Sequence, residues 1–219
     1  MNRLALFDCD GTLVDSGATI HRALAMTFAE AGLTVPEAKE SRRVIGLSLV
    51  EAMAAMLPDA EPHVHLALAE EYKRAFQRQR GEGSVEEPLY AGIVDAIETL
   101  EADGWLLGVA TGKSDRGLRL CLERHDLHPR FVTLQTADRH PSKPHPSMIE
   151  QAMADAGAAP ETTLMIGDTS FDMAMARAAG VTAIGVAWGY HDAQELLAAG
   201  ADFIAEQPSD IIGFAKAMA

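Results

Sequence analysis

The sequence predicts an α/β fold: a doubly wound, Rossmann-like parallel sheet core with an inserted all-helical cap domain. Two observations support this prediction. From about residue 88 onward, short continuous apolar runs alternate with helical patterns, as expected for buried parallel strands joined by helices. Between about residues 17 and 80, apolar residues recur only at helical spacing, and no strand candidate interrupts them. The first strand therefore belongs to a sheet whose other strands follow only after a long helical insertion.

Length and composition limit the classes of protein to which the chain can belong. With 219 residues, 48% of them hydrophobic and 23% charged, it is long enough for an α/β domain with a smaller inserted unit. A formal net charge of −14 argues against nucleic acid or an anionic membrane as a partner. The sequence shows no apolar run long enough to span a membrane, no signal peptide before the first strand and no disulfide framework. We therefore expect a cytoplasmic protein, either a monomer or a homodimer.

The first element is an apolar strand at residues 4–7, and it ends in the run Asp8-Cys9-Asp10-Gly11-Thr12. In an extended chain, residues i and i+2 point to the same side, so Asp8 and Asp10 face one spot while Cys9 points to the core. Two carboxylates about 4 Å apart repel by about 4 kcal/mol at an effective dielectric constant near 20. The pair therefore destabilises the fold unless a cation or a shared proton relieves it, which favours a metal-dependent catalytic site.

Helices are expected next, from about residue 17 to residue 80. Apolar side chains recur at i, i+3 and i+4 in the first of them and again around Met53, and a charged helix follows from about Pro62 to Arg80. The flanking stretches at 14–17 and 81–87 are suited to be linkers, the second because it is rich in glycine. The predicted domains are an α/β core at 1–15 and 83–219 and a helical cap at 16–82.

The later strands are predicted by continuous apolar runs at 106–110, 131–134, 164–166 and 183–186. In open parallel sheets, ligands bind beyond the carboxyl ends of the strands. The residues that follow these strands are a hydroxyl at the start of a helix, a lysine and two acids: Thr111-Gly112, Lys143, Asp168 and Asp172. Together with the first two aspartates, they make a set that suits phosphoryl transfer with a divalent cation.

The chain resembles the haloacid dehalogenase superfamily over essentially its whole length, because four segments match the four motifs of that superfamily in order and spacing. The segments are Asp8-x-Asp10-Gly-Thr, Thr111-Gly-Lys, Lys143-Pro-x-Pro and Gly167-Asp-x-x-x-Asp172. The small helical insertion and the run at 10–16 look most like the phosphoglycolate phosphatase-like branch. The resemblance implies a Mg²⁺-dependent phosphatase that hydrolyses a small phosphorylated metabolite, a phosphoglycolate-like monoester, through an aspartyl-phosphate intermediate.

The resemblance also implies a role for each acidic residue of the motifs. Asp8 is expected to be the nucleophile, and Asp10 the general acid of the first step and the base of the second. Mg²⁺ would be held by the carboxylates of Asp8 and Asp168 and by the main-chain carbonyl of Asp10. Asp172 and Thr12 are expected in the shell around these ligands.

The substrate is expected to contact four residues from the other segments and the cap. Thr111, the main-chain amide of Gly112 and Lys143 would bind the phosphoryl group. Arg43, in the cap, could reach a carboxylate or hydroxyl of the substrate. Lys113 is expected to face solvent, because segment 108–114 lacks the four-residue spacing between glycines that a phosphate-binding P-loop requires.

Two alternatives stay open at this point. A phosphosugar mutase of the β-phosphoglucomutase type would share these motifs, although such proteins usually carry Val or Ile where this chain has Thr12. A non-catalytic binding module on the same fold is the second alternative, since fold does not dictate function. Dehalogenation is disfavoured by Asp10, because a departing halide needs no proton. The sequence does not identify the phosphate ester.

Overall fold

The structure, a computed structural model, describes residues 1–218 and contains a six-stranded parallel sheet. Its strands are β1 (Asn2–Phe7), β2 (Trp105–Thr111), β3 (Phe131–Thr136), β4 (Ala158–Gly167), β5 (Thr182–Val186) and β6 (Phe203–Ala205). They lie in the order β3-β2-β1-β4-β5-β6, so β1 is central. Leu6 of β1 is in register with Gly108 of β2 on one side and Met165 of β4 on the other. This order, with strands added outward in both directions from β1, confirms the predicted doubly wound sheet.

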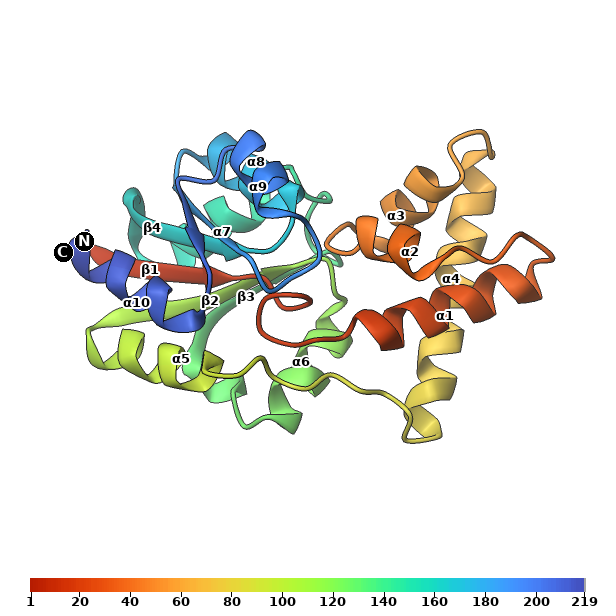
Figure 1. Cartoon of the computed structure of the whole chain (residues 1–219), viewed down its shortest axis with the longest axis horizontal. Helices are drawn as coiled ribbons and strands as arrows, with labels where there is room; N and C mark the ends of the chain where they lie inside the picture. Colours follow the sequence, from red (N-terminus) through yellow and green to blue (C-terminus); the bar gives the residue numbers. More distant parts are fainter. Residues whose placement is uncertain (219) are drawn as a thin grey trace.

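Helices cover both faces of the sheet and make a three-layer core (Figure 1). One face is covered by α5 (Ile93–Ala102), α6 (Asp115–Arg124) and α10 (Pro208–Ala217), and the other by α7 (Ser147–Ala156), α8 (Ser170–Ala179) and α9 (Ala193–Ala198). Side chains of β1 alternate between the two layers: Ala5 and Phe7 pack with the first, and Leu4 and Leu6 with the second. Burial on both faces explains why the strands read as continuous apolar runs.

The cap lies beyond the carboxyl edge of the sheet and consists of α1 (Gly17–Glu30), α2 (Ala38–Arg43), α3 (Leu49–Met56) and α4 (Pro62–Gly81) (Figure 1). Its apolar side chains form a separate cluster around Leu24, Phe28 and Met53, and all members of this cluster lie between residues 20 and 76. A separate cluster supports the proposed division into a core and a cap. Both chain termini lie at the far end of the core (Figure 1).

Two elements differ from the sequence prediction. Strand β6 was not predicted, because three residues are too few to show a period. Strand β4 begins at Ala158, six residues before the apolar run at 164–166. Ala158 pairs with Asn2 of β1, and the register between the two strands then shifts before Leu4 pairs with Thr163. Within residues 1–218, no helix has both the length and the hydropathy that crossing a bilayer requires.

Candidate active site

Three buried carboxylates meet at the carboxyl edge of the sheet. Asp8 directly follows β1, Asp168 directly follows β4, and Asp172 lies in the first turn of α8. Each offers an oxygen, and these oxygens lie within 4.8 Å of one another. All three side chains are fully buried. The structure therefore brings together acids that are 160 residues apart in the chain, as the sequence predicted from the strand ends.

Asp168 is held in a narrow space that glycines leave open. A Cβ atom on Gly11, whose φ is +84°, would lie 2.1 Å from Asp168 Oδ2, and one on Gly189 would lie 2.1 Å from Asp168 Cβ. The Thr12 hydroxyl donates to Asp168 Oδ1 at 2.9 Å, and the Tyr190 amide donates to Oδ2 at 2.9 Å. Asp168 is thus fixed in orientation beside Asp8, in part by the hydrogen bond from Thr12.

Lys143 supplies the cation of this cluster. Its Nζ lies 3.0 Å from Asp8 Oδ2 and 2.6 Å from Asp172 Oδ1, and the side chain is fully buried. Burial alone would lower its pKa, but the Asp172 and Asp8 carboxylates hold the pKa above its usual value, so Lys143 stays charged. The other oxygen of Asp172 accepts hydrogen bonds from the amide and hydroxyl of Thr169. With both oxygens engaged, Asp172 is suited to orient Lys143 and to support the other two acids.

The cluster carries more negative charge than Lys143 can balance. Burial raises the pKa of the Asp8 carboxyl to about 7, although Lys143 opposes the shift. Burial and the neighbouring Asp8 and Asp172 carboxylates raise the pKa of Asp168 well above its usual value. All three carboxyl groups can be ionised at the same time only if a further cation joins Lys143 in balancing their negative charge. Closely spaced carboxylate oxygens are the donors that a hard divalent cation prefers, so the residues present fit such an ion.

Asp10 lies beside this cluster and has a different set of partners. Its Oδ1 accepts a hydrogen bond from the Ser16 hydroxyl and lies 2.9 Å from Lys113 Nζ. Lys113 Nζ also lies 2.7 Å from Oε1 of Glu87, a buried acid in the linker that follows the cap. The prediction that Lys113 faces solvent is wrong, because its side chain is only 9% exposed. Burial acts to lower the pKa of Lys113, but the Asp10 and Glu87 carboxylates raise this pKa by more than burial lowers it. Lys113 is therefore a cation.

Thr111 and Gly112 lie where a phosphoryl group would meet the start of α6. Thr111 is buried at the end of β2, and its hydroxyl accepts a hydrogen bond from the Lys113 amide at 3.3 Å. Ser114 caps α6 by accepting from the Gly117 amide at 3.1 Å. The amides that lead into this helix are of the kind that bind phosphoryl oxygens.

A loop of the cap covers this edge of the site. A Cβ atom on Gly112 would lie 2.6 Å from the Leu47 carbonyl oxygen, so only glycine allows the loop to approach so closely. The Ser48 amide donates to the Ser142 hydroxyl at 2.9 Å, next to Lys143. The cap loop at 46–48 therefore contacts Gly112 of the second motif segment and Ser142, the residue before Lys143.

Arg43 lies away from the other predicted site residues. Its Nη1 lies 2.7 Å from Glu195 Oε1 of α9, and both side chains are partly exposed. Among the described residues, those that line the cavity between cap and core do not include Arg43. In this arrangement Arg43 connects the cap to the core, which does not support the predicted contact with the substrate.

Sequence reasoning missed three residues that contact the site: Ser16 contacts Asp10, Glu87 contacts Lys113, and Tyr190 contacts Asp168. Glu87 lies in the linker that follows the cap, where nothing in the local sequence shows which residue it will contact. Tyr190 acts on Asp168 through its main-chain amide, which every residue except proline possesses. The hydroxyl of Ser16, six residues after Asp10, was the only one with a visible signal, since short spacing and a linker position allow contact.

Comparisons with known proteins agree with this geometry. A family model described as "Haloacid dehalogenase-like hydrolase" matches residues 5–186. The chain is 35% identical over 224 residues to "Probable phosphatase IndB" of Dickeya dadantii, covering 100% of this chain and 95% of the relative. It is 31% identical to "Pyrophosphatase PpaX" of Anoxybacillus flavithermus and 29% identical to "Phosphoglycolate phosphatase" of Synechococcus elongatus, in each case over 94% of both chains. A solved haloacid dehalogenase-like hydrolase from Streptococcus pneumoniae superposes with a TM-score of 0.84 at 28% identity, covering 97% of this chain and 98% of that one.

Proposed function

This chain belongs to the haloacid dehalogenase-like hydrolase family, and we propose that it is a Mg²⁺-dependent phosphatase that cleaves a phosphomonoester through an aspartyl-phosphate on Asp8. The observation that carries the proposal is the buried cluster of Asp8, Asp168 and Asp172 around Lys143, with Asp10 beside it. Relatives named as phosphatases support it. We propose the cytoplasm as its location, as expected from the sequence.

The carboxylates of Asp8 and Asp168 and the main-chain carbonyl of Asp10 would hold the metal ion. When bound, Mg²⁺ neutralises the excess negative charge of the acids and polarises the phosphoryl oxygens. Lys143 adds a second positive charge next to Asp8, and Asp172 orients it. These residues together make it possible for Asp8 to be ionised in spite of its burial, which its role as nucleophile requires.

In the first step, a carboxylate oxygen of Asp8 forms a bond to phosphorus while the bond from phosphorus to the ester oxygen breaks. Asp10, in its acid form, gives its proton to the departing oxygen, so the alcohol leaves neutral. In the second step, water attacks the phosphorus of the aspartyl-phosphate. Asp10, now a carboxylate, takes a proton from that water, and the step releases inorganic phosphate and restores the Asp8 carboxylate.

The decisive experiment is to measure phosphate release from a panel of phosphate esters, with Mg²⁺ and with EDTA. We expect Mg²⁺-dependent hydrolysis of at least one ester. Conversion of glucose 1-phosphate to glucose 6-phosphate without phosphate release would identify a mutase instead. A folded, Mg²⁺-bound protein that releases phosphate from no ester would favour the binding module.

Replacing Asp168 with asparagine is expected to separate metal binding from folding. In EDTA the unfolding free energy should stay equal or rise by about 1 kcal/mol, because the change removes one of three crowded buried charges. Mg²⁺ should raise the Tm of the natural protein and not that of the variant, since a ligand stabilises only the state it binds. Thermal and urea unfolding with and without Mg²⁺ measure both effects. Equal stabilisation of the two proteins by Mg²⁺ would place the metal elsewhere.

The Arg43→Ala variant tests the predicted contact of Arg43 with the substrate. Because the ion pair with Glu195 is half-exposed, its loss should change the unfolding free energy by less than about 1 kcal/mol. KM for the hydrolysed ester should stay within about twofold, as expected for a residue outside the cavity, and Glu195→Ala should behave alike. A KM raised about tenfold in Arg43→Ala alone would restore the predicted substrate contact, since that is the loss of about 1.4 kcal/mol of binding.

A further inference from the structure

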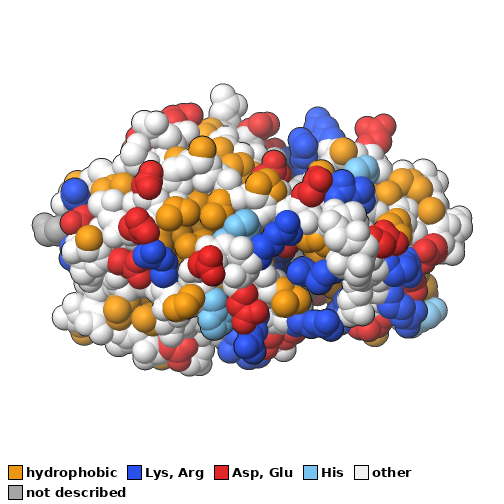
Figure 2. All heavy atoms as spheres, turned by 90° about the horizontal axis from the view of Figure 1, so that it is seen from below, with side chains coloured by type: hydrophobic (Ala, Val, Ile, Leu, Met, Phe, Trp, Pro, Cys, Tyr) orange, Lys and Arg blue, Asp and Glu red, His pale blue; other side chains and the backbone are white. Residues whose placement is uncertain are grey.

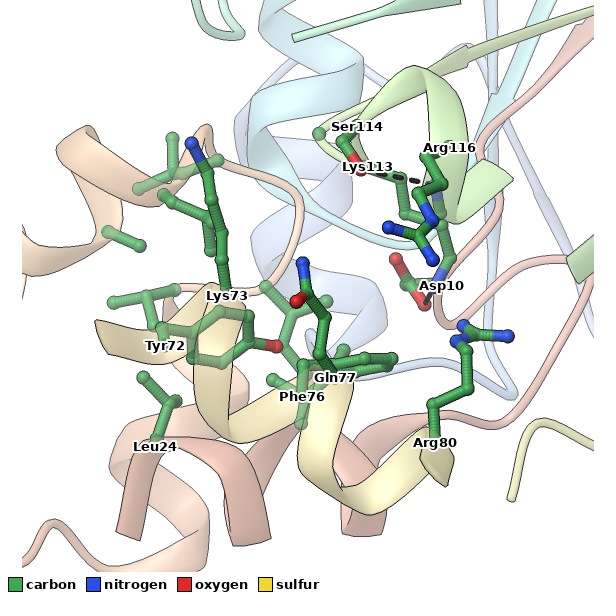
Figure 3. Close-up of a pocket in the computed structure, with 18 of the residues that line it drawn as sticks. Asp10, Leu24, Tyr72, Lys73, Phe76, Gln77, Arg80, Lys113, Ser114 and Arg116 are labelled. Carbon is green, nitrogen blue, oxygen red and sulfur yellow. Dashed lines mark hydrogen bonds and ion pairs between the residues drawn. The ribbon is translucent and has the colours of Figure 1, made fainter. Parts of the chain in front are cut away.

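A cavity of about 560 Å³ lies between the cap and the core, and it reaches the proposed phosphoryl site at one end (Figure 3). At that end it is lined by Asp10, Gly112 and Lys113. Pockets of roughly 300–1,000 Å³ are the ones that enclose drug-sized ligands. A two-carbon ester would therefore fill only a small part of this cavity, which leaves room for a larger substrate.

The wall that the cap contributes is apolar. It is formed by side chains from α1, α3 and α4, among them Leu24, Leu49, Tyr72 and Phe76. Figure 3 shows Tyr72 and Phe76 projecting from α4 on the side of the cavity that faces Asp10 and Lys113. The two rings lie 6.0 Å apart between centroids, and Phe76 is only half-buried. An apolar, aromatic wall favours a substrate body that gains by leaving water.

Polar groups surround the outer part of the cavity. Gln77 and Arg80 extend from α4 and Arg116 from α6, and all three line the cavity (Figure 3). Lys and Arg side chains gather at the junction of cap and core on one face of the molecule (Figure 2), in a chain whose net charge is −14. These donors could bind acceptor atoms at the outer edge of a substrate that is apolar in its middle.

We propose that the substrate is a phosphomonoester whose alcohol carries a flat ring, about as large as a nucleoside, with the ring packed against Phe76 and its neighbours in the cap. This inference rests on the proposed phosphatase function and narrows its substrate class. It differs from the small phosphoglycolate-like ester expected from the sequence. The phosphoryl group lies at Asp8, and the ring fills the apolar part of the cavity.

Two matched pairs of esters test the proposal, because the members of each pair differ mainly in the ring. The first pair is uridine 5′-monophosphate and ribose 5-phosphate, and the second is 2-phenylethyl phosphate and ethyl phosphate. We expect kcat/KM to be about tenfold or more higher for the ring-bearing member, since even one methylene group in an apolar pocket is worth about 10-fold or more. A preference in the first pair alone indicates a ring with polar edges, and one in the second alone indicates a purely apolar ring.

A variant and its control test whether the preference for ring-bearing esters depends on the apolar wall that the cap contributes to the cavity. Phe76→Ala should reduce the ratio of kcat/KM within the preferred pair, mainly by raising KM for the ring-bearing ester. Leu66→Ala is the matched control, because Leu66 lies on the same helix, is 56% exposed and is outside the cavity, so its ratio should stay unchanged. Phe76→Leu keeps an apolar side chain if the alanine variant does not fold, and it should reduce the ratio less.

The results separate this inference from the proposed function. Equal or lower kcat/KM for the ring-bearing member in both pairs, with Mg²⁺-dependent hydrolysis intact, overturns the inference and leaves the phosphatase in place. A preference that Phe76→Ala and Phe76→Leu do not change also overturns it, because the ring would then bind elsewhere. No Mg²⁺-dependent release from any of the four esters, nor from phosphoglycolate or 4-nitrophenyl phosphate, defeats the proposed function itself.

Discussion

Replacing Asp8 with asparagine is expected to lower kcat by about 10⁴-fold or more, the scale of loss seen when a catalytic nucleophile is removed. The amide has the shape of the carboxylate but cannot form the acyl-phosphate bond. The fold should survive, because the amide oxygen can still accept the hydrogen bond that the Cys9 amide donates to Asp8 Oδ1 at 2.6 Å. Since burial raises the pKa of Asp8 to about 7, the change also removes a charge that the metal-free fold accommodates poorly.

Phosphate release and the mass of the protein during turnover measure this effect. The natural protein should show a phosphorylated fraction that Asp8→Asn lacks. Asp59→Asn is the matched control, because the same change on an exposed residue of the cap should affect neither rate nor mass. If Asp8→Asn retained more than a few per cent of the natural rate, the nucleophile would have to be another residue.

The site residues that the sequence predicts well are those that follow the carboxyl ends of the strands. A buried parallel strand has one direction and a regular side-chain alternation, so the residue that follows it is placed by local sequence alone. Asp8 after β1 and Asp168 after β4 are brought together in this way, and Lys143 joins them from a loop that follows β3. The same regularity explains why the doubly wound parallel sheet could be predicted.

The parts that were missed depend on contacts between segments with no shared period. Lys113 is expected to face solvent because segment 108–114 lacks the spacing of a P-loop, yet its side chain is mostly buried and contacts Glu87 from the linker and Asp10 from the first motif. Arg43 is expected near the substrate because it is a cationic residue of the cap, whereas in the structure it pairs with Glu195 of α9. The cavity likewise depends on how four helices pack, which no single segment specifies.

The Lys113 contacts bear on how Asp10 can serve as both acid and base. Lys113 Nζ lies 2.9 Å from Asp10 Oδ1, so a positive charge faces the oxygen that would accept a proton from water in the proposed second step. Lys113 is shared with Glu87, so its positive charge has a second buried partner when Asp10 carries a proton. Glu87 and Ser16 lie in the two linkers, so the position of the cap and the environment of Asp10 are connected through them.

Replacing Asp10 with asparagine should therefore lower kcat for an alkyl phosphate by about 10²–10⁴-fold, the usual contribution of general acid–base catalysis. The fold should be retained, since Lys113 keeps Glu87 as a partner at 2.7 Å. With 4-nitrophenyl phosphate, whose leaving group needs no proton, the first step should be nearly unaffected. The second step still needs a base, so the phosphorylated protein should accumulate.

Rapid-mixing kinetics with the two esters, together with the mass of the protein, measure these steps separately. Asp10→Asn should show a burst of 4-nitrophenol followed by slow turnover, and it should show no burst with an alkyl phosphate. An equal loss with both esters, without accumulation of the phosphorylated form, would mean that Asp10 positions its neighbours rather than moving a proton. In that case Asp10 would act by holding Ser16 and Lys113 in position through its hydrogen bond and its ion pair. Ser16→Ala should then reproduce much of the loss of activity seen with Asp10→Asn.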